Sequence, residues 1–554
     1  MTGLQRPFIS DNLYRLLFLF LGIVYAFGLF VPLMDNDSAH HANIALHMHL
    51  TGDYASLVDY NGAYLDKPHL HFWLAAMAYK IFGVTGFAYK LPSLLFSILG
   101  VYSTYRLGKS LYNKETGKLA ALILASSFAF ILANNDVRMD AILTACIAFA
   151  SWQLVDFIQW KKWMNVAGAA LGLALGFSTK GNIAVFVPAV GAFFYILYYK
   201  DWKIFINPKW LVLLLLFAIG ITPVVYCYYL QYNLHPEVVV RGKDHIDGVT
   251  FILFNQSVER FAGEMGHDAR NDYFFFLHSF LWAFAPWSFI AYYALFLRLK
   301  NFLKRKDEWF TPGVIIVIII VVSISGFKLP HYLNIVFPAA SVLTASWLMQ
   351  SGEKAVWLKP LQLGIAGILF AGLLVINFWA FPIKSYLIYA GLIITLALFM
   401  YSLRSVLLNR YQQSIVLSVA VMICVFFLLN TNFYPQLLRY QGGNNLAQMP
   451  MVVKGHINHD KIYVWKRFYS SSFEFYTSSL RKEIPDTAAL TGDDNWLLYD
   501  IKDSDEILKA GYKVTSVFNT PDFEITKLDL PLLNPEKRDK LCSVMVLGKV
   551  EKVR

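Results

Sequence analysis

The sequence is poor in charged residues and in cysteine. Only 15% of its 554 residues are Asp, Glu, Lys or Arg, whereas a soluble globular chain has about 25%. This shortage argues against a soluble globular protein. The 4 cysteines do not suggest a disulfide framework or a CxxC metal site. Cys146, Cys227 and Cys424 lie inside apolar runs, and Cys542 stands alone near the C-terminus.

Apolar residues are abundant instead, since 57% of the chain is hydrophobic and 16% is aromatic. A helix that crosses a bilayer needs about 20 such residues, and representative runs are residues 13–33, 211–230, 314–325 and 415–429. We therefore expect an all-α polytopic membrane protein with about 13 transmembrane helices. The first run is too long for a signal peptide and has no small-residue cleavage site, so we expect no cleavable signal.

The net charge of +11 does not indicate a nucleic-acid partner, because the basic residues concentrate in short connectors between apolar runs. These connectors are residues 106–118, 161–162, 200–209, 298–306, 354–359 and 404–410. They occupy alternate loops, which is the positive-inside pattern of membrane proteins. With an odd number of spans, the pattern predicts a cytoplasmic N-terminus and a C-terminus on the outer side.

The outward segments are then residues 35–86, 134–138, the turn at Lys180, and residues 232–272, 328–331 and 434–554. We expect short interfacial helices at 39–50 and 71–82. The last segment has short β-like runs at 461–465, 496–500, 513–518 and 543–547, and a helix-like stretch at 503–510. We therefore divide the chain into a membrane domain, 1–433, with outer loops 34–86 and 232–272, and a C-terminal α/β extramembrane domain, 434–554.

Ionisable residues at outward helix ends are functional candidates, because charge near hydrocarbon is costly. Asp35 and Asp37 follow the first span, and Asp66 and Lys67 precede Pro68. Carboxylates and a cation beside the headgroups suit an amphiphilic, anionic substrate. A solvated loop with ordinary interfacial anchors is the alternative.

Residues 134–140 read NNDVRMD, at the start of a span. Asp136 and Asp140 are four residues apart and are expected on one helix face. Arg138 is placed to neutralise Asp140. A structural Arg–Asp clamp and a substrate contact are both open at this point.

Five cations gather on the outward side and together predict a lipid phosphate site: Lys67, Lys180, Arg260, Arg270 and Lys328. Lys180 stands in an outer turn, where a Lys acts as a point charge for phosphate; snorkelling to headgroups is the alternative. His267 and His331 accompany these cations. The many other histidines of residues 40–71 form no chelate, because H-x-H pairs on a helix point about 200° apart. A zinc site with Asp66 and His267 as ligands is nevertheless an alternative.

The motifs NDSAHHANIA, YLDKPHLHFW, RMDAILT, GFSTKGNIAVFVPA, NQSVERFAGEMGH, FAPW and KLPHYLNIVFPA follow one another in this order. Together they resemble the GT-C membrane glycosyltransferases of the protein O-mannosyltransferase and lipid A aminoarabinose transferase group. The resemblance runs from the first span to about the tenth. It implies a GT-C fold in a bacterial inner membrane, with a periplasmic C-terminal domain. It also implies transfer of a sugar from a polyprenyl (undecaprenyl) phosphate to an acceptor at the outer face.

The resemblance places Asp37 at the family's catalytic aspartate. Ser38 stands where the family usually has Glu, and Asp66 stands where the aminoarabinose branch has Glu. We expect displacement with inversion, with Asp37 as the base for the acceptor hydroxyl. The other candidates fall into two groups. Lys67 and Arg260 lead the phosphate contacts, ahead of Lys180, Lys328 and Arg270, and the site-shaping residues are Asp35, Asp66, Arg138, Asp140, His267 and His331.

No cofactor is required by this chemistry, although a divalent metal such as zinc is kept as an alternative. The expected partners are the lipid-linked sugar donor, a lipid or protein acceptor and the bilayer, with no nucleic acid; we expect a monomer. The acceptor is open between lipid A, protein Ser/Thr and a growing glycan. A transporter of lipid-linked sugars and an outer-face assembly or binding protein are the alternatives from other classes. A transporter would carry charge at broken helices in mid-span.

Overall fold

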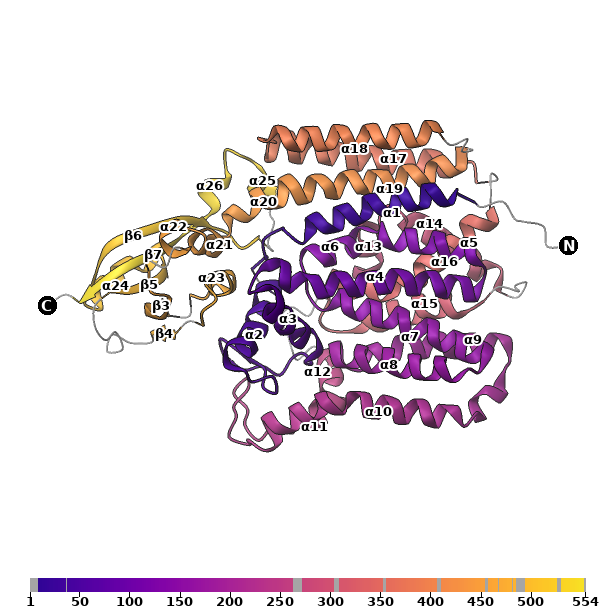
Figure 1. The fold of residues 1–554 in the computed structure, drawn as a ribbon, viewed down its shortest axis with the longest axis horizontal. Coiled ribbons are helices and arrows are strands. Elements are labelled where there is room, and N and C mark those ends of the chain that lie inside the picture. Colours follow the sequence, from indigo (N-terminus) through magenta and orange to yellow (C-terminus); the bar gives the residue numbers. More distant parts are fainter. Residues whose placement is uncertain are drawn as a thin grey trace.

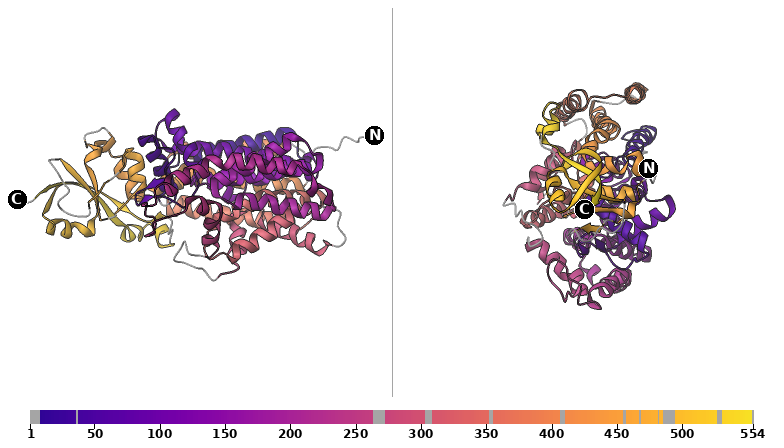
Figure 2. Two further views of the ribbon diagram at one scale, coloured as in Figure 1. Left: turned by 90° about the horizontal axis from the view of Figure 1, so that it is seen from below. Right: turned by 90° about the vertical axis from the view of Figure 1, so that its left-hand side faces the viewer.

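The computed structural model describes residues 8–35, 37–262, 272–302, 308–351, 355–405, 410–453, 457–466, 468–480, 482–484, 494–525 and 530–552. Figure 1 shows a bundle of helices with a small sheet domain beyond one end. The N-terminus lies at the opposite end of the bundle from this domain. The short helices α2 (Asp37–Thr51) and α3 (Leu70–Phe82) lie between the domain and the bundle, as Figure 2 also shows.

The bundle is built from helices of 8 to 26 residues. They are α1 (Asp11–Gly28), α4 (Gly86–Leu111), α5 (Lys114–Ala125), α6 (Phe128–Asn135), α7 (Asp140–Trp160), α8 (Trp163–Lys180), α9 (Ile183–Tyr199), α10 (Lys209–Tyr228), α13 (Phe275–Ala283), α14 (Ser288–Lys300), α15 (Phe310–Ile324), α16 (Phe337–Ser351), α17 (Leu358–Leu374), α18 (Tyr386–Ser405) and α19 (Arg410–Leu428). Within the described residues, 6 helical stretches are long and apolar enough to cross a membrane, or 7 if the bent pair α5 and α6 is one span. The chain is an integral membrane protein, and the number of about 13 spans stays a prediction.

The helices differ in how much of their surface other helices cover. The apolar window of α7 is 94% buried inside the protein, whereas that of the helix that begins with α10 is only 22% buried. The open face of α10 carries Leu211, Leu214 and Ile219. An apolar surface of this kind is stable against lipid tails, so α7 is a central helix and α10 lies at the lipid boundary.

The basic connectors meet one another at the N-terminal end of the bundle. Lys118 forms an ion pair with Asp11 at 2.5 Å, and Lys209 donates to the carbonyl of Lys161. Arg298, at the start of the connector 298–306, places its Nη2 2.9 Å from the hydroxyl of Tyr112 in the connector 106–118. This end is therefore the basic one. Its position opposite the C-terminal domain agrees with the predicted orientation, which stays a prediction.

The segment between α1 and α4 contains two short helices, α2 (Asp37–Thr51) and α3 (Leu70–Phe82), and a hairpin of β1 (Val58–Asp59) and β2 (Gly62–Ala63). The helices expected at 39–50 and 71–82 are thus confirmed. They pack together through a small core of their own, to which Ile44, Phe72 and Tyr79 belong. Phe475 of the C-terminal domain completes this core. The second large outward loop holds α11 (Gly248–Thr250) and α12 (Gln256–Ala262).

The C-terminal part forms a five-stranded mixed sheet of order β4-β3-β5-β7-β6. Its elements are α20 (Tyr434–Leu437), α21 (Gly442–Ala447), α22 (Pro450–Val453), β3 (Ile462–Trp465), α23 (Ser471–Thr477), β4 (Lys482–Ile484), β5 (Asn495–Asp500), α24 (Ser504–Lys509), β6 (Tyr512–Asp522), α25 (Leu530–Leu533), α26 (Arg538–Leu541) and β7 (Ser543–Lys552). The predicted α/β character and four of these strands are confirmed, and β4 was missed. The helical path that begins with α19 continues to Tyr440, so the expected boundary at 433/434 falls inside a helix.

Candidate active site

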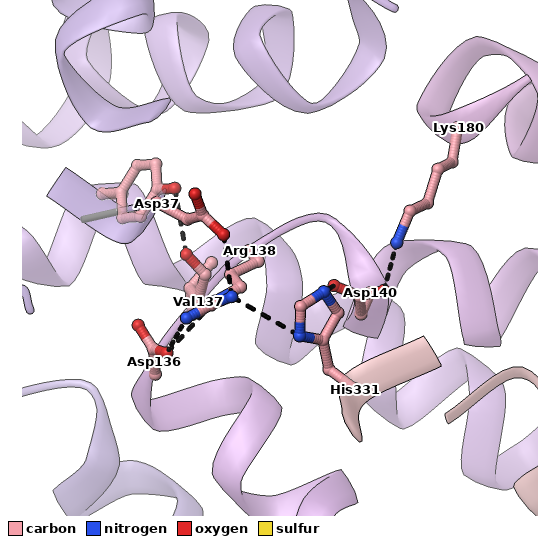
Figure 3. Close-up of polar contacts among 8 residues, drawn as sticks. Asp37, Asp136, Val137, Arg138, Asp140, Lys180 and His331 are labelled. Atoms are coloured by element: carbon pink, nitrogen blue, oxygen red, sulfur yellow. Dashed lines mark hydrogen bonds and ion pairs between the residues drawn. The ribbon is translucent and has the colours of Figure 1, made fainter. Parts of the chain in front are cut away.

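Asp37 is the first residue of α2, a helix that lies at the end of the bundle nearest the C-terminal domain (Figure 1). Its Oδ2 accepts a hydrogen bond of 2.7 Å from Nη1 of Arg138 (Figure 3). Asp37 is partly exposed, with 37% of its side chain accessible, whereas Arg138 is more covered at 18%. A carboxylate that is open on one side and fixed on the other can receive a proton from a bound molecule.

Arg138 lies in the break between α6 and α7 and holds two carboxylates. Besides Asp37, its Nη2 lies 3.1 Å from Oδ2 of Asp136. These neighbours, with Asp140, raise the pKa of Arg138 although burial opposes them, so the guanidinium stays charged. Asp136 caps the end of α6, and Asp140 begins α7. The expectation that both share one helix face is therefore wrong, because the chain turns between them.

Asp140 forms its ion pair with Lys180. The Lys180 ammonium donates a hydrogen bond of 2.6 Å to Oδ1 of Asp140, and both side chains are buried. The clamp between Arg138 and Asp140, one of the two alternatives, is thus not formed, since Arg138 turns toward Asp37 and Asp136. Lys180 is the last residue of α8 rather than part of an exposed turn. Its Nζ also lies 4.7 Å from the ring centre of Tyr332.

His331 connects the two ion-paired groups. Its Nδ1 lies 3.4 Å from Nη1 of Arg138, and its Nε2 lies 3.8 Å from Oδ2 of Asp140. His331 belongs to the 3-10 turn Pro330–Val336 that leads into α16. The side chains of Asp37, Arg138, His331, Asp140 and Lys180 therefore form one continuous chain of polar contacts (Figure 3).

A polar cavity of about 250 Å³ opens beside this chain of contacts. Its walls come from α2, the loop before α3, the break before α7, the end of α8 and the turn before α16. The lining residues are Asp37, His40, His41, Tyr64, Asp66, Lys67, Arg138, Met139, Asp140, Lys180, Phe327, Leu329, His331 and Tyr332. A second cavity of about 410 Å³ shares Asp37, Arg138 and His331 with the first and reaches Trp282 and Asn334.

An apolar cavity of about 350 Å³ meets the polar one at Lys180 and Tyr332. It lies among α7, α9, α12 and α15, and its other lining residues are Leu143, Asn182, Ile183, Phe186, Gln256, Ser257, Val321, Val322, Ser325 and Ile335. Lys180 thus stands where an apolar space changes into a polar one. This arrangement accommodates a molecule with an apolar chain and an anionic head.

The remaining predicted site residues are placed differently. Lys67 and Asp66 line the polar cavity, and Asp66 forms an ion pair with Arg241 of the second outward loop. Lys328 is buried with its Nζ 5.3 Å from the ring centre of Tyr273 and is not among the residues that line these cavities.

Asp35 does not reach the polar cavity, because its carboxylate turns to the C-terminal domain and accepts hydrogen bonds from Ser470 and Ser472. Arg260 lies in α12, but its side chain is outside the described residues. His267 and Arg270 lie outside the described residues altogether.

A metal centre gains no support from the described ranges, in which no group of three or more His, Cys, Asp or Glu is arranged to hold an ion. Asp66 is already engaged by Arg241, and His267 is not described. The zinc hypothesis therefore stays a prediction.

Tyr332 and Arg241 are among the contributors to the site that were missed from the sequence. Tyr332 lines both main cavities, and Arg241 binds Asp66 and also Glu259. Tyr332 directly follows the predicted site residue His331, and this position in the sequence pointed to it. Its contact with Lys180, however, joins two segments that are far apart in the sequence. Arg241 carried the same signal as the other basic residues of its loop.

Comparisons with known proteins point to one group of enzymes. A family model described as dolichyl-phosphate-mannose-protein mannosyltransferase matches residues 66–227. The undecaprenyl phosphate-alpha-4-amino-4-deoxy-L-arabinose arabinosyl transferase of Pseudomonas paraeruginosa is 26% identical over 279 residues, or 48% of each chain. An uncharacterized protein of Aquifex aeolicus is 26% identical over 334 residues, which are 60% of this chain and 62% of that one. The chain therefore spans between about half and 62% of the length of these relatives.

The fold is similar to that of ArnT from Cupriavidus metallidurans bound to undecaprenyl phosphate, with a TM-score of 0.71 and 15% identity. The alignment covers 97% of this chain and 98% of that one. The apo state of the same protein matches with a TM-score of 0.69. The resemblance to GT-C membrane glycosyltransferases is confirmed, and the GT-C fold with a small C-terminal domain is confirmed with it.

Proposed function

We propose that the protein is an inverting glycosyltransferase that moves a sugar from a polyprenyl phosphate to an acceptor at the outer face of a bacterial inner membrane. One observation carries the proposal: the apolar cavity joins the polar cavity at Lys180, and Asp37 lies on the polar side. A lipid-linked sugar has the same order of parts, with an isoprenoid chain, a phosphate and a sugar. The similarity to the arabinosyl transferases supports this assignment.

The donor binds with its isoprenoid chain in the apolar cavity, between α9 and α15. Its phosphate lies at Lys180, the one cation that lines both cavities among the described residues. Lys67 and Arg138 line the polar cavity and supply further positive charge. Fixed cations at this point stabilise the negative charge that develops on the leaving phosphate.

The reaction is a direct displacement at the anomeric carbon. The acceptor oxygen attacks this carbon from the side opposite the phosphate, and the bond between the carbon and the phosphate oxygen breaks. The bonding electrons leave with the polyprenyl phosphate, and the acceptor proton moves to Asp37. The configuration of the anomeric carbon is inverted, because the acceptor oxygen enters in a single step on the face opposite the departing phosphate. Arg138 orients Asp37 for this task through the 2.7 Å contact.

The ranking of the candidate phosphate-binding cations differs from the ranking expected from the motifs alone. Lys180 moves ahead of Lys67, since Lys180 is the cation that lines both cavities among the described residues. Arg260 and Arg270 keep their proposed role without a described side chain. Lys328 lies farther away, beside Tyr273, and is the weakest of the five.

Lipid A or another envelope glycolipid is the proposed acceptor, because several similar proteins are arabinosyl transferases that use undecaprenyl phosphate-aminoarabinose. A protein Ser or Thr is the second candidate, favoured by the mannosyltransferase model that matches residues 66–227. A transporter fits less well. Its charges would lie in mid-span, whereas Asp37, Arg138 and Lys180 lie at helix ends.

The test uses purified full-length protein in detergent with radiolabelled undecaprenyl-phosphate sugars. Lipid A and Ser/Thr peptides are offered in parallel as acceptors. We expect labelled product with one acceptor class and release of undecaprenyl phosphate in equal amount. Carrier binding without product from either class would contradict both proposed acceptors and favour another acceptor or the transporter.

A further inference from the structure

Helix α23 of the C-terminal domain contacts the chain on both sides of Asp37. Two residues before it, the Asp35 carboxylate accepts hydrogen bonds of 2.7 Å from the backbone N–H and from the hydroxyl of Ser472. Six residues after it, Asn43 Nδ2 donates to the Ser471 carbonyl at 2.8 Å and to Oε2 of Glu474 at 3.0 Å. The first turn of α23 thus holds both the chain just before α2, at Asp35, and the second turn of α2, at Asn43.

The chain before Asp37 is fixed by the same domain. The Leu33 N–H donates to the hydroxyl of Tyr476 at 2.9 Å, and the Leu33 carbonyl accepts from Nε2 of Gln441 at 2.9 Å. Phe475 of α23 is fully buried in the core formed by α2 and α3. The backbone N–H and carbonyl of Leu33 are therefore both hydrogen-bonded to residues more than 400 positions away in the sequence.

These contacts are shielded from water. Ser472 is 0% exposed, Glu474 5% and Asn43 7%. A buried hydrogen bond that loses one partner leaves the other unsatisfied, which is costly. The contacts therefore hold α2 in one position, and bonds of this kind set the position of the residue that α2 carries at its first turn.

We propose that α23 positions the catalytic carboxylate, with Asp35, Asn43 and Glu474 as positioning residues. The C-terminal domain thus acts on the reaction through α2, and none of its described residues lines the polar cavity. This inference rests on the proposed role of Asp37 as base. A displacement of a reacting group by about 1 Å is enough to reduce the rate of an enzyme by two orders of magnitude, so the rate should depend on these bonds.

The test compares three variants in the full-length protein. Glu474→Ala removes an acceptor from Asn43, Glu474→Gln keeps an acceptor oxygen, and Glu506→Ala removes an exposed residue of the same domain that pairs with Lys466. We expect kcat to fall at least tenfold in Glu474→Ala with the donor KM unchanged within twofold. Glu474→Gln should keep at least half of the wild-type kcat, and Glu506→Ala should behave as wild type. If Glu474→Ala does not accumulate, Asn43→Ala breaks the same bond from the other side.

Hydrogen exchange of residues 37–51 provides a readout that needs no substrate. We expect faster exchange there in Glu474→Ala than in the wild type, Glu474→Gln or Glu506→Ala. An unchanged kcat together with unchanged exchange in Glu474→Ala would overturn the proposal, as would an equal loss of kcat in Glu474→Gln. Exchange could be faster in Glu474→Ala while the wild-type protein transfers no sugar. This result would support the coupling of α23 to α2 and would reject the proposed function.

Discussion

The Lys180 ammonium lies 2.6 Å from Oδ1 of Asp140, although the two residues are 40 positions apart in the sequence. The pair is buried, with 7% and 3% of the side chains exposed. It joins the end of α8 to the start of α7 at the junction of the apolar and polar cavities. A charge at this depth needs a partner, and Asp140 is the carboxylate that partners Lys180.

Replacement of Lys180 by Met should destabilise the protein by about 3–5 kcal/mol, because Asp140 is then left as an unpaired buried charge. The double variant Lys180→Met with Asp140→Asn should recover most of this stability, since neither charge remains. Transfer should stay lost in both. Thermal unfolding in detergent and the transfer assay measure the two properties separately, and transfer by the double variant at the wild-type rate would contradict the phosphate role.

Filling the apolar cavity should weaken the binding of long donors. Val321 lines this cavity, and Ile324 lies on the same helix, α15, with 54% of its surface exposed. We expect Val321→Trp to raise the KM for an undecaprenyl-linked donor at least tenfold, and to change the KM for a donor with a short isoprenoid chain much less. Ile324→Trp is the matched control and should resemble the wild type. Equal KM changes for long and short donors would contradict the assignment of the isoprenoid chain to this cavity.

Stability should fall with rising pH because of Asp522. Burial is the main cause that raises the pKa of Asp522 to about 6, and the carboxylates of Asp35 and Asp500 add to the effect. The folded protein therefore holds this proton more tightly than the unfolded chain does. The contribution is fully present below the unfolded pKa of 3.8, is lost as pH rises through the folded pKa of about 6, and amounts to at most about 3 kcal/mol.

Asp522→Asn should remove this pH dependence. The amide oxygen of Asn can still accept the 2.8 Å hydrogen bond that the Gly442 N–H donates to Asp522. Thermal unfolding of the full-length variant is measured between pH 4 and pH 7 against the wild type. A variant that loses stability over this range as steeply as the wild type would show that another group is responsible.

The sequence was informative where the physics is local. Long apolar runs predict spans, and alternating short runs predict the strands of the C-terminal domain, so both parts of the fold followed from patterns. Strand β4 (Lys482–Ile484) was missed because it has only 3 residues. The first-loop helices were predictable from their aromatic flanks.

The partners of charged side chains were less predictable. Arg138 is two residues from both Asp136 and Asp140, and this spacing does not reveal its direct contact with Asp37, which lies 101 positions away. The turn between α6 and α7 decides this choice, and its direction depends on tertiary packing. Asp35 was grouped with Asp37 by position, yet its neighbours belong to α23. Contacts between distant segments are therefore what the structure adds to the candidate site.

The most direct test of the proposed mechanism compares wild type with Asp37→Asn in one experiment. Binding of undecaprenyl phosphate and transfer from a labelled undecaprenyl-phosphate sugar are measured on the same purified samples. We predict that Asp37→Asn binds the carrier with the wild-type affinity, unfolds at a similar temperature and transfers no sugar, because it lacks only the base. Transfer by Asp37→Asn at a rate near that of the wild type would contradict the account.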